Sequence, residues 1–189
     1  ERVRIGEGIR WTKGVDLVQA APQDFLAHPG NWMQWLSDYR ATATAGPNFA
    51  WVLATRALKR MKDLDLSRLT VALSGAEPVD PKAVDAFVVE AARFGFTPGG
   101  MFPAFGMAEV AIAGTFPPRR RGLVTDTVDR IVLETQRVAK PVEVTDPDEL
   151  GLSARQLPLL GTPVPGLEMK VVHPESYEEL PERHVGELL

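Results

Sequence analysis

The chain has no cysteine, and its 189 residues include only three histidines. The lack of cysteine excludes disulfides, thiolate zinc sites and a cysteine nucleophile. His28, His173 and His184 are scattered along the sequence, so they have neither the spacing of a zinc site nor a pattern that assigns a catalytic histidine. Thiol chemistry is therefore excluded, and a histidine-based metal or triad site has no support.

Excess positive charge and long apolar runs are also missing. The net charge of −4 argues against nucleic-acid binding as the main role. No apolar run approaches the ~20 residues that cross a bilayer, and no signal peptide is visible. We therefore expect a cytoplasmic protein without a membrane span. Its glycines form no phosphate loop of the Walker or Rossmann kind.

What the first 116 residues do contain is an alternation of short apolar runs and amphipathic stretches. This alternation predicts a parallel α/β arrangement. The expected strands are residues 16–21, 41–44, 69–73 and 110–115, and the expected helices are residues 31–40, 48–62 and 81–91.

Two of these helices have recognisable starts. Asn48 is the expected N-cap of the first, whose apolar stripe would be Phe49, Val52, Leu53, Ala57 and Met61. Asp80 followed by a proline is the expected start of the second, which would bury Val84, Phe87, Val88 and Ala91.

The alternation stops at residue 117. Residues 130–133 and 141–144 are β-prone, residues 146–149 form an acidic turn, residues 161–166 form a rigid turn, and residues 168–173 are an expected strand. The predicted fold is α/β, with a mostly parallel sheet flanked by helices and part of a smaller β-rich subdomain. We expect an incomplete domain with three regions: 1–116, 117–160 and 161–189.

Two stretches each follow an apolar or small-residue run and are candidates for a ligand site. They are Ser74-Gly75-Ala76-Glu77-Pro78 and Pro103-Ala104-Phe105-Gly106-Met107-Ala108-Glu109. Ligands of open α/β sheets collect beyond the carboxyl ends of the strands, and a carboxylate there can hold Mg²⁺. The residues alone leave this reading about even with solvated carboxylates at helix starts. Ser74 as a hydrolase nucleophile is disfavoured, because Ala72 stands where that elbow needs glycine.

Together, these segments resemble the acyl-adenylate-forming superfamily, and most closely the fatty acyl-AMP ligases. Residues 105–109 resemble the family's Tyr-Gly-Met-Ala-Glu motif, and residues 74–78 resemble its Asn-Gly-Ala-Glu-Pro adenine loop. Residues 46–51 resemble the stretch that opens the helix beside the acyl pocket. The resemblance runs from about Asp16 to the last residue, with Phe105 in place of tyrosine and Ser74 in place of asparagine.

The resemblance implies a role for each matching residue. Phe105 would stack on the adenine, and Glu109 would be the catalytic residue that holds Mg²⁺. The other cofactor-binding residues would be Gly75, Ala76, Glu77, Pro78, Gly106, Met107 and Ala108, and the acyl pocket would be bordered by Pro47, Asn48 and Phe49.

The resemblance also implies a reaction. ATP and Mg²⁺ would activate a medium- or long-chain fatty acid to an acyl-adenylate, for transfer to an acyl carrier protein or polyketide synthase. Residues 123–157 would be an insertion that disfavours transfer to CoA. The family's phosphate loop and C-terminal domain have no counterpart in the chain, so we expect the 189 residues alone to be inactive. The alternatives are a fatty acyl-CoA synthetase, which uses CoA, and a non-catalytic nucleotide- or acyl-binding module.

Overall fold

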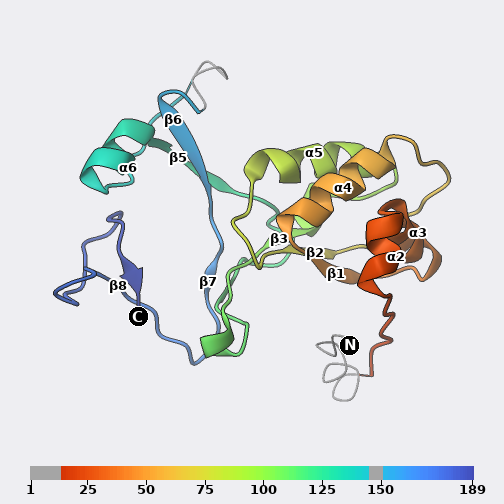
Figure 1. The fold of residues 1–189 in the computed structure, drawn as a ribbon, viewed down its shortest axis with the longest axis horizontal. Helices are drawn as coiled ribbons and strands as arrows, with labels where there is room; N and C mark the ends of the chain where they lie inside the picture. Colours follow the sequence, from red (N-terminus) through yellow and green to blue (C-terminus); the bar gives the residue numbers. More distant parts are fainter. Residues whose placement is uncertain (1–13, 145–150) are drawn as a thin grey trace.

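A three-stranded parallel sheet forms the centre of the N-terminal part. The computed structural model describes residues 14–144 and 151–189. The strands β1 (Ala43–Gly46), β2 (Val71–Ser74) and β3 (Met101–Pro103) lie in the order β1-β2-β3 (Figure 1). This sheet and its helices confirm the predicted fold class.

Four helices accompany this sheet. α4 (Asn48–Leu58) connects β1 to β2, and α5 (Pro81–Ala92) leads from β2 toward β3. α2 (Pro22–Ala27) and α3 (Gly30–Asp38) precede β1, so the expected helix over residues 31–40 is confirmed. A short 3₁₀ turn, η1 (Pro98–Gly100), leads into β3.

The hydrophobic core lies between these helices and one face of the sheet. On that face Ala72 and Ser74 of β2 are fully buried, whereas the alternate residues Val71 and Leu73 are only half-buried. Trp51 of α4 lies at the centre of the core, where its ring contacts Phe87 of α5 at a centroid distance of 4.7 Å. A buried aromatic side chain of this kind stabilises a fold by about 1.5–3 kcal/mol through removal from water.

The start of α5 is as predicted. The Asp80 side chain accepts a hydrogen bond from the Lys82 backbone N–H at 2.9 Å, which satisfies one of the free donors at the helix start. Val84, Phe87 and Ala91 are all fully buried, so the predicted face of this helix is confirmed.

The prediction for α4 is wrong in its cap and in its buried face. Pro47 occupies the N-cap position and Asn48 is the first helical residue. The buried residues are Ala50, Trp51, Ala54, Thr55 and Leu58, one position away from the predicted stripe. The reason is Trp51: burying its large ring aligns the small alanines of the same face with the core, and Phe49 stays half exposed.

Two predicted strands are absent from the described residues. Residues 16–21, which lie immediately before α2, belong to no strand. Residues 110–115 fail as a strand because Ala111 and Ile112 adopt left-handed φ angles of 53° and 75°. Only Thr115 belongs to a strand, β4 (Thr115–Phe116), and the 3₁₀ turn η2 (Ala108–Val110) precedes the left-handed residues.

The segment after residue 122 folds into a compact unit of its own. β5 (Thr125–Asp129) pairs antiparallel with β6 (Ala154–Pro158), and α6 (Arg130–Gln136) lies between them in the sequence. The predicted strand at 130–133 is therefore wrong. Asp129 accepts from the Val132 N–H at 2.9 Å, and this cap starts a helix despite the β-branched residues. The predicted acidic turn at 146–149 lies outside the described residues.

Short antiparallel pairs complete the β-rich part. β4 pairs with β7 (Thr162–Pro163), and β8 (Val171–Val172) pairs with β9 (Glu187–Leu188). Pro141, in the other β-prone stretch, forms an isolated bridge to Val128. Among the residues that the structure describes, no helix has the length and apolar character needed to cross a bilayer.

Candidate functional site

The three stretches singled out in the sequence meet at one edge of the sheet. The register places Gly46 opposite Ser74, and Ser74 opposite Pro103, so β1, β2 and β3 end on one line. The Ser74 carbonyl oxygen accepts a hydrogen bond from the Ala104 N–H at 2.9 Å just beyond that line. The loops that follow these strands therefore start side by side, in the position where parallel sheets bind ligands.

The loop after β2 is held tightly at its base and exposed at its tip. Gly75 is buried, and a Cβ added there would lie 3.1 Å from the Ala104 carbonyl oxygen. Ala76 adopts a left-handed φ of 67°, which turns the chain outward. Ala76, Glu77 and Pro78 are all exposed. The tip is thus free to contact a flat ring.

This loop is hydrogen-bonded to the start of α4. The Glu77 carboxylate accepts from the Phe49 backbone N–H at 2.8 Å. The Asn48 side-chain oxygen accepts from the Asp80 backbone N–H at 3.2 Å. The predicted acyl-pocket residues and the predicted adenine loop are therefore in direct contact, which no local pattern in the sequence indicated.

The loop after β3 folds back on itself as a tight hairpin. The Phe105 and Thr115 backbones exchange hydrogen bonds of 3.2 and 2.9 Å. Gly106 lies so close to the returning chain that an added Cβ would be 1.5 Å from the Ile112 carbonyl oxygen. Only glycine fits this position, and the crossing fixes where the half-buried Phe105 ring lies.

Met107, Ala108 and Glu109 project from the turn of this hairpin and are exposed. Within the described ranges, no group of three acidic, histidine or cysteine residues could hold a metal ion by itself. Mg²⁺ is commonly bound by one or two carboxylates together with substrate phosphates. The single Glu109 carboxylate therefore fits a magnesium ion that arrives with a nucleotide, and does not fit a resident metal centre.

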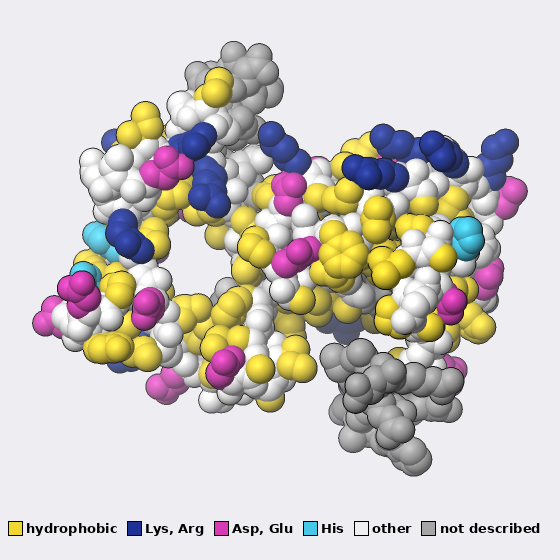
Figure 2. Space-filling model, viewed as in Figure 1, with side chains coloured by type: hydrophobic (Ala, Val, Ile, Leu, Met, Phe, Trp, Pro, Cys, Tyr) yellow, Lys and Arg dark blue, Asp and Glu magenta, His cyan; other side chains and the backbone are white. Residues whose placement is uncertain are grey.

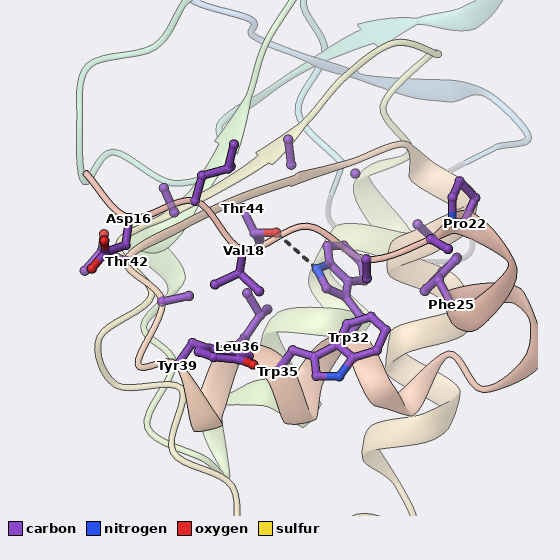
Figure 3. Close-up of a pocket in the computed structure, with 18 of the residues that line it drawn as sticks. Asp16, Val18, Pro22, Phe25, Trp32, Trp35, Leu36, Tyr39, Thr42 and Thr44 are labelled. Carbon is purple, nitrogen blue, oxygen red and sulfur yellow. Dashed lines mark hydrogen bonds between the residues drawn. The ribbon is translucent and has the colours of Figure 1, made fainter. Parts of the chain in front are cut away.

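An apolar groove of about 900 Å³ lies along β1 and is lined by residues of β1, α3 and the segment before α2 (Figure 3). Pro47 and Phe49 line it, whereas Asn48 does not. Trp32, Trp35 and Val18 converge on the hollow in the close-up, and the Trp32 ring N–H donates to the Thr44 hydroxyl at 3.1 Å.

The expected acyl pocket named Pro47, Asn48 and Phe49, two of which line this groove, whereas Trp32 and Trp35 were not among the expected site residues. Both are only partly buried and line the groove, and Trp32 also packs against the hydrophobic core. The sequence signal that could have indicated these walls of the groove is the presence of two tryptophans in α3, neither of which is fully buried.

Charge is unevenly distributed around the site. Basic side chains gather over the C-terminal end of α4, away from the strand ends (Figure 2), where Arg56, Lys59, Arg60 and Lys62 are exposed. Arg121 lies inward, and its guanidinium donates to the Leu159 carbonyl oxygen. Of the basic residues 119–121, Arg121 is therefore held by a hydrogen bond within the structure.

Comparison with known proteins assigns the family. The family of AMP-binding enzymes matches residues 9–189. The chain belongs to this family. Among curated AMP-binding relatives, Rv1013 of Mycobacterium tuberculosis, named as a ligase, is 38% identical over 92% of this chain. JamA of Moorena producens, a medium-chain-fatty-acid–[acyl-carrier-protein] ligase, is 29% identical over 93% of it.

Solved structures of AMP-binding enzymes share the fold. A fatty acyl-adenylate ligase of Legionella pneumophila, solved with acyl adenylate and pyrophosphate, has a TM-score of 0.80 at 26% identity and covers 93% of this chain. The adenylation domain of a keto acid-selecting NRPS module has a TM-score of 0.81 at 31% identity, also over 93%. The fold and the resemblance to fatty acyl-AMP ligases are thereby confirmed.

The chain spans about a third of the length of these proteins. It covers 31% of Rv1013, 29% of JamA and 30% of the Legionella ligase. The chain therefore corresponds to only one part of the length of such a protein.

Proposed function

We propose that the full-length protein containing these residues activates a medium- or long-chain fatty acid with ATP, forming an acyl-adenylate. The observation that carries the proposal is the common edge at which β1, β2 and β3 end, with the three family stretches beginning there in register. In a member of the AMP-binding family, this arrangement supports a nucleotide and a carboxylic acid bound side by side.

The reaction needs positioning more than a reactive side chain. A carboxylate oxygen of the fatty acid attacks the α-phosphorus, the bond from that phosphorus to the bridging oxygen breaks, and pyrophosphate leaves. Phe105 and the backbone of residues 75–78 would hold the adenine, and Gly106 would permit its close approach. Met107 and Ala108 would border the reacting groups. Such positioning is worth many orders of magnitude in rate.

Glu109 would bind the magnesium ion of the ATP complex. Bound Mg²⁺ neutralises phosphate charge as it develops. Replacing an interaction of this kind typically lowers kcat by roughly 100-fold or more.

The groove supports an apolar acyl substrate. It is lined mostly by aliphatic and aromatic side chains, and it reaches the start of α4 at Pro47 and Phe49. A hydrocarbon chain gains about 0.8 kcal/mol per buried CH₂ in such surroundings. A keto acid is the second candidate substrate, because the keto acid-selecting adenylation domain shares 31% identity with this chain.

We propose an acyl carrier protein or polyketide synthase as the acceptor of the acyl group. The relative JamA is named as a carrier-protein ligase, which supports this. β5, α6 and all of β6 except Pro158 lie within residues 123–157, the candidate insertion that would disfavour CoA. A CoA synthetase and a non-catalytic binding module remain the alternatives that the experiment below separates. The cytoplasm, where ATP is available, is the proposed location.

The 189 residues by themselves should not form acyl-adenylate at a useful rate. Their sequence contains no glycine-rich phosphate loop, so the pyrophosphate leaving group would have little to hold it. Release of pyrophosphate by the isolated chain, dependent on both ATP and fatty acid, would contradict this expectation.

The test is product identification with the full-length protein. ATP, Mg²⁺ and a series of fatty and keto acids are supplied with and without CoA, and products are identified by mass spectrometry. Acyl-adenylate that persists with CoA present supports the proposal, acyl-CoA identifies a CoA synthetase, and the absence of any activated acid leaves the binding module. Glu109→Gln should lower the rate of product formation by roughly 100-fold or more, whereas the matched exposed variant Glu168→Gln should not.

A further inference from the structure

The hydrogen bonds between the loop after β2 and the start of α4 join two parts of the site that the sequence treats as separate. We propose that Glu77 is a positioning residue that couples the nucleotide loop to the acyl-pocket helix through the Phe49 backbone N–H. The proposal rests on the function proposed above, and it assigns Glu77 a role other than direct contact with the adenine.

The start of α4 needs a hydrogen-bond acceptor from elsewhere. The first N–H groups of a helix have no partner within the helix, and the N-cap residue here is Pro47, whose side chain can accept nothing. Glu77, 28 positions away, supplies its carboxylate to the Phe49 N–H at 2.8 Å. A carboxylate at this end of a helix is also favoured by the helix dipole. The position of Glu77 therefore governs the first turn of α4.

A second hydrogen bond connects the start of α4 to the start of α5. Asn48 accepts from the Asp80 N–H at 3.2 Å, and the Asp80 side chain in turn caps α5 through the Lys82 N–H. The loop is thus attached to the starts of two helices, while its base is packed at Gly75 against the Ala104 carbonyl. A displacement of the loop tip is therefore transmitted to α4 and is not absorbed within the loop.

Phe49 connects the Glu77 hydrogen bond to the proposed acyl groove. Its side chain is 50% exposed and lines the apolar groove, while its N–H is the group that Glu77 holds. A nucleotide that orders residues 75–78 would therefore order the wall of the acyl groove as well. By linkage, an acyl chain in the groove would raise the affinity for the nucleotide by the same factor.

The experiment measures that coupling in the full-length protein. The dissociation constant of α,β-methylene ATP is determined with and without dodecanoate, and that of dodecanoate with and without the nucleotide. Wild type should show mutual tightening of about tenfold, the order expected of one hydrogen bond to a charged group. Glu77→Ala should bring the factor close to one. Glu77→Gln, which keeps the acceptor oxygen, should retain most of it.

A purely structural role predicts a different pattern. It would lower the melting temperature of Glu77→Ala and weaken both ligands without changing the coupling factor, and that result would overturn the proposal. So would the absence of coupling in wild type, or its equal loss in Glu77→Gln. Asp85→Ala, which deletes an exposed carboxylate on α5, should leave the coupling factor unchanged.

Two further points keep the test decisive. If Glu77→Ala does not fold, Asn48→Ala removes the second bond with Glu77 intact, and it should lower the coupling factor partially; an unchanged factor counts against the proposal. Formation of acyl-adenylate by wild type, measured in parallel, reports on the proposed function independently. An active enzyme without Glu77-dependent coupling refutes only the positioning role.

Discussion

Gly106→Ala is the substitution for which the structure makes the sharpest prediction. The added Cβ would lie 1.5 Å from the Ile112 carbonyl oxygen and 2.7 Å from its carbon, where ordinary contact begins at 3.4 Å. The two sides of the hairpin must separate by roughly 2 Å, because the atoms that the Cβ would meet are backbone atoms of Ile112 and cannot rotate away. Overpacking of this kind destabilises a fold by about 1–3 kcal/mol.

The effect on activity should exceed the effect on stability. The separation would displace Phe105 and Glu109 from the positions set by the hairpin, and misplacement by about 1 Å can lower a rate by roughly 100-fold. We therefore expect Gly106→Ala in the full-length protein to lose at least that factor in acyl-adenylate formation, measured as pyrophosphate release. Thermal unfolding measured alongside separates this loss from global unfolding.

The same substitution at Gly30 is the matched control. A Cβ there would meet the Met61 sulfur at 3.4 Å and the Ala57 Cβ at 3.5 Å, which are ordinary contacts. Gly30→Ala should leave rate and melting temperature close to wild type. Wild-type activity in Gly106→Ala would refute the reasoning, since it would show that the hairpin crossing does not position the site.

Three further predictions concern the stability of the fold. Trp51→Ala should lower the free energy of unfolding by about 3–5 kcal/mol, because the ring is fully buried and its N–H donates to the Gly46 carbonyl oxygen at 2.9 Å; urea titration measures this. Asp80→Ala should cost about 1 kcal/mol through loss of the α5 cap, also by urea titration, whereas Asp85→Ala should be neutral. Hydrogen bonds from the Ser67 side chain and backbone hold the pKa of Asp65 below its ordinary value of 3.8. That carboxylate therefore contributes stability above its unfolded pKa and loses it as pH falls through the folded pKa. Asp65→Asn should flatten the melting temperature below about pH 4, and an unchanged acid limb would contradict the assignment.

The start of α5 and the strands and helices from β1 to α5 could be predicted from local sequence. The pair Asp80-Pro81 predicted the start of α5, because a cap and a first-turn proline act on the backbone within three residues. The strand predicted at residues 110–115 is wrong because the prediction considered only local sequence. Their apolar composition favours a strand, yet the crossing at Gly106 forces Ala111 and Ile112 into left-handed conformations.

The site was predicted residue by residue from its resemblance to a family, and its geometry was not. Residues 74–78 and 103–109 were expected to share one ligand site, but the register that aligns Gly46, Ser74 and Pro103 is a property of the folded sheet. An acyl pocket was expected at Pro47, Asn48 and Phe49, but the other walls of the groove were not predicted, since they come from segments up to 35 positions apart, from Val15 to Ala50. The roles of Gly75, Phe105 and Glu109 toward a nucleotide remain predictions.

The sequence by itself determined the alternation of strands and helices from β1 to α5, the cap of α5 and the places of the three family stretches, because each depends on neighbouring residues. Only the tertiary structure decided which face of α4 is buried and which partner Glu77 holds. Both depend on contacts between residues distant in the chain: the Trp51 ring packs against Phe87, and the Glu77 carboxylate reaches the unpaired N–H of Phe49. Periodicity allows several faces and several partners, and packing density together with hydrogen-bond satisfaction selects one of each.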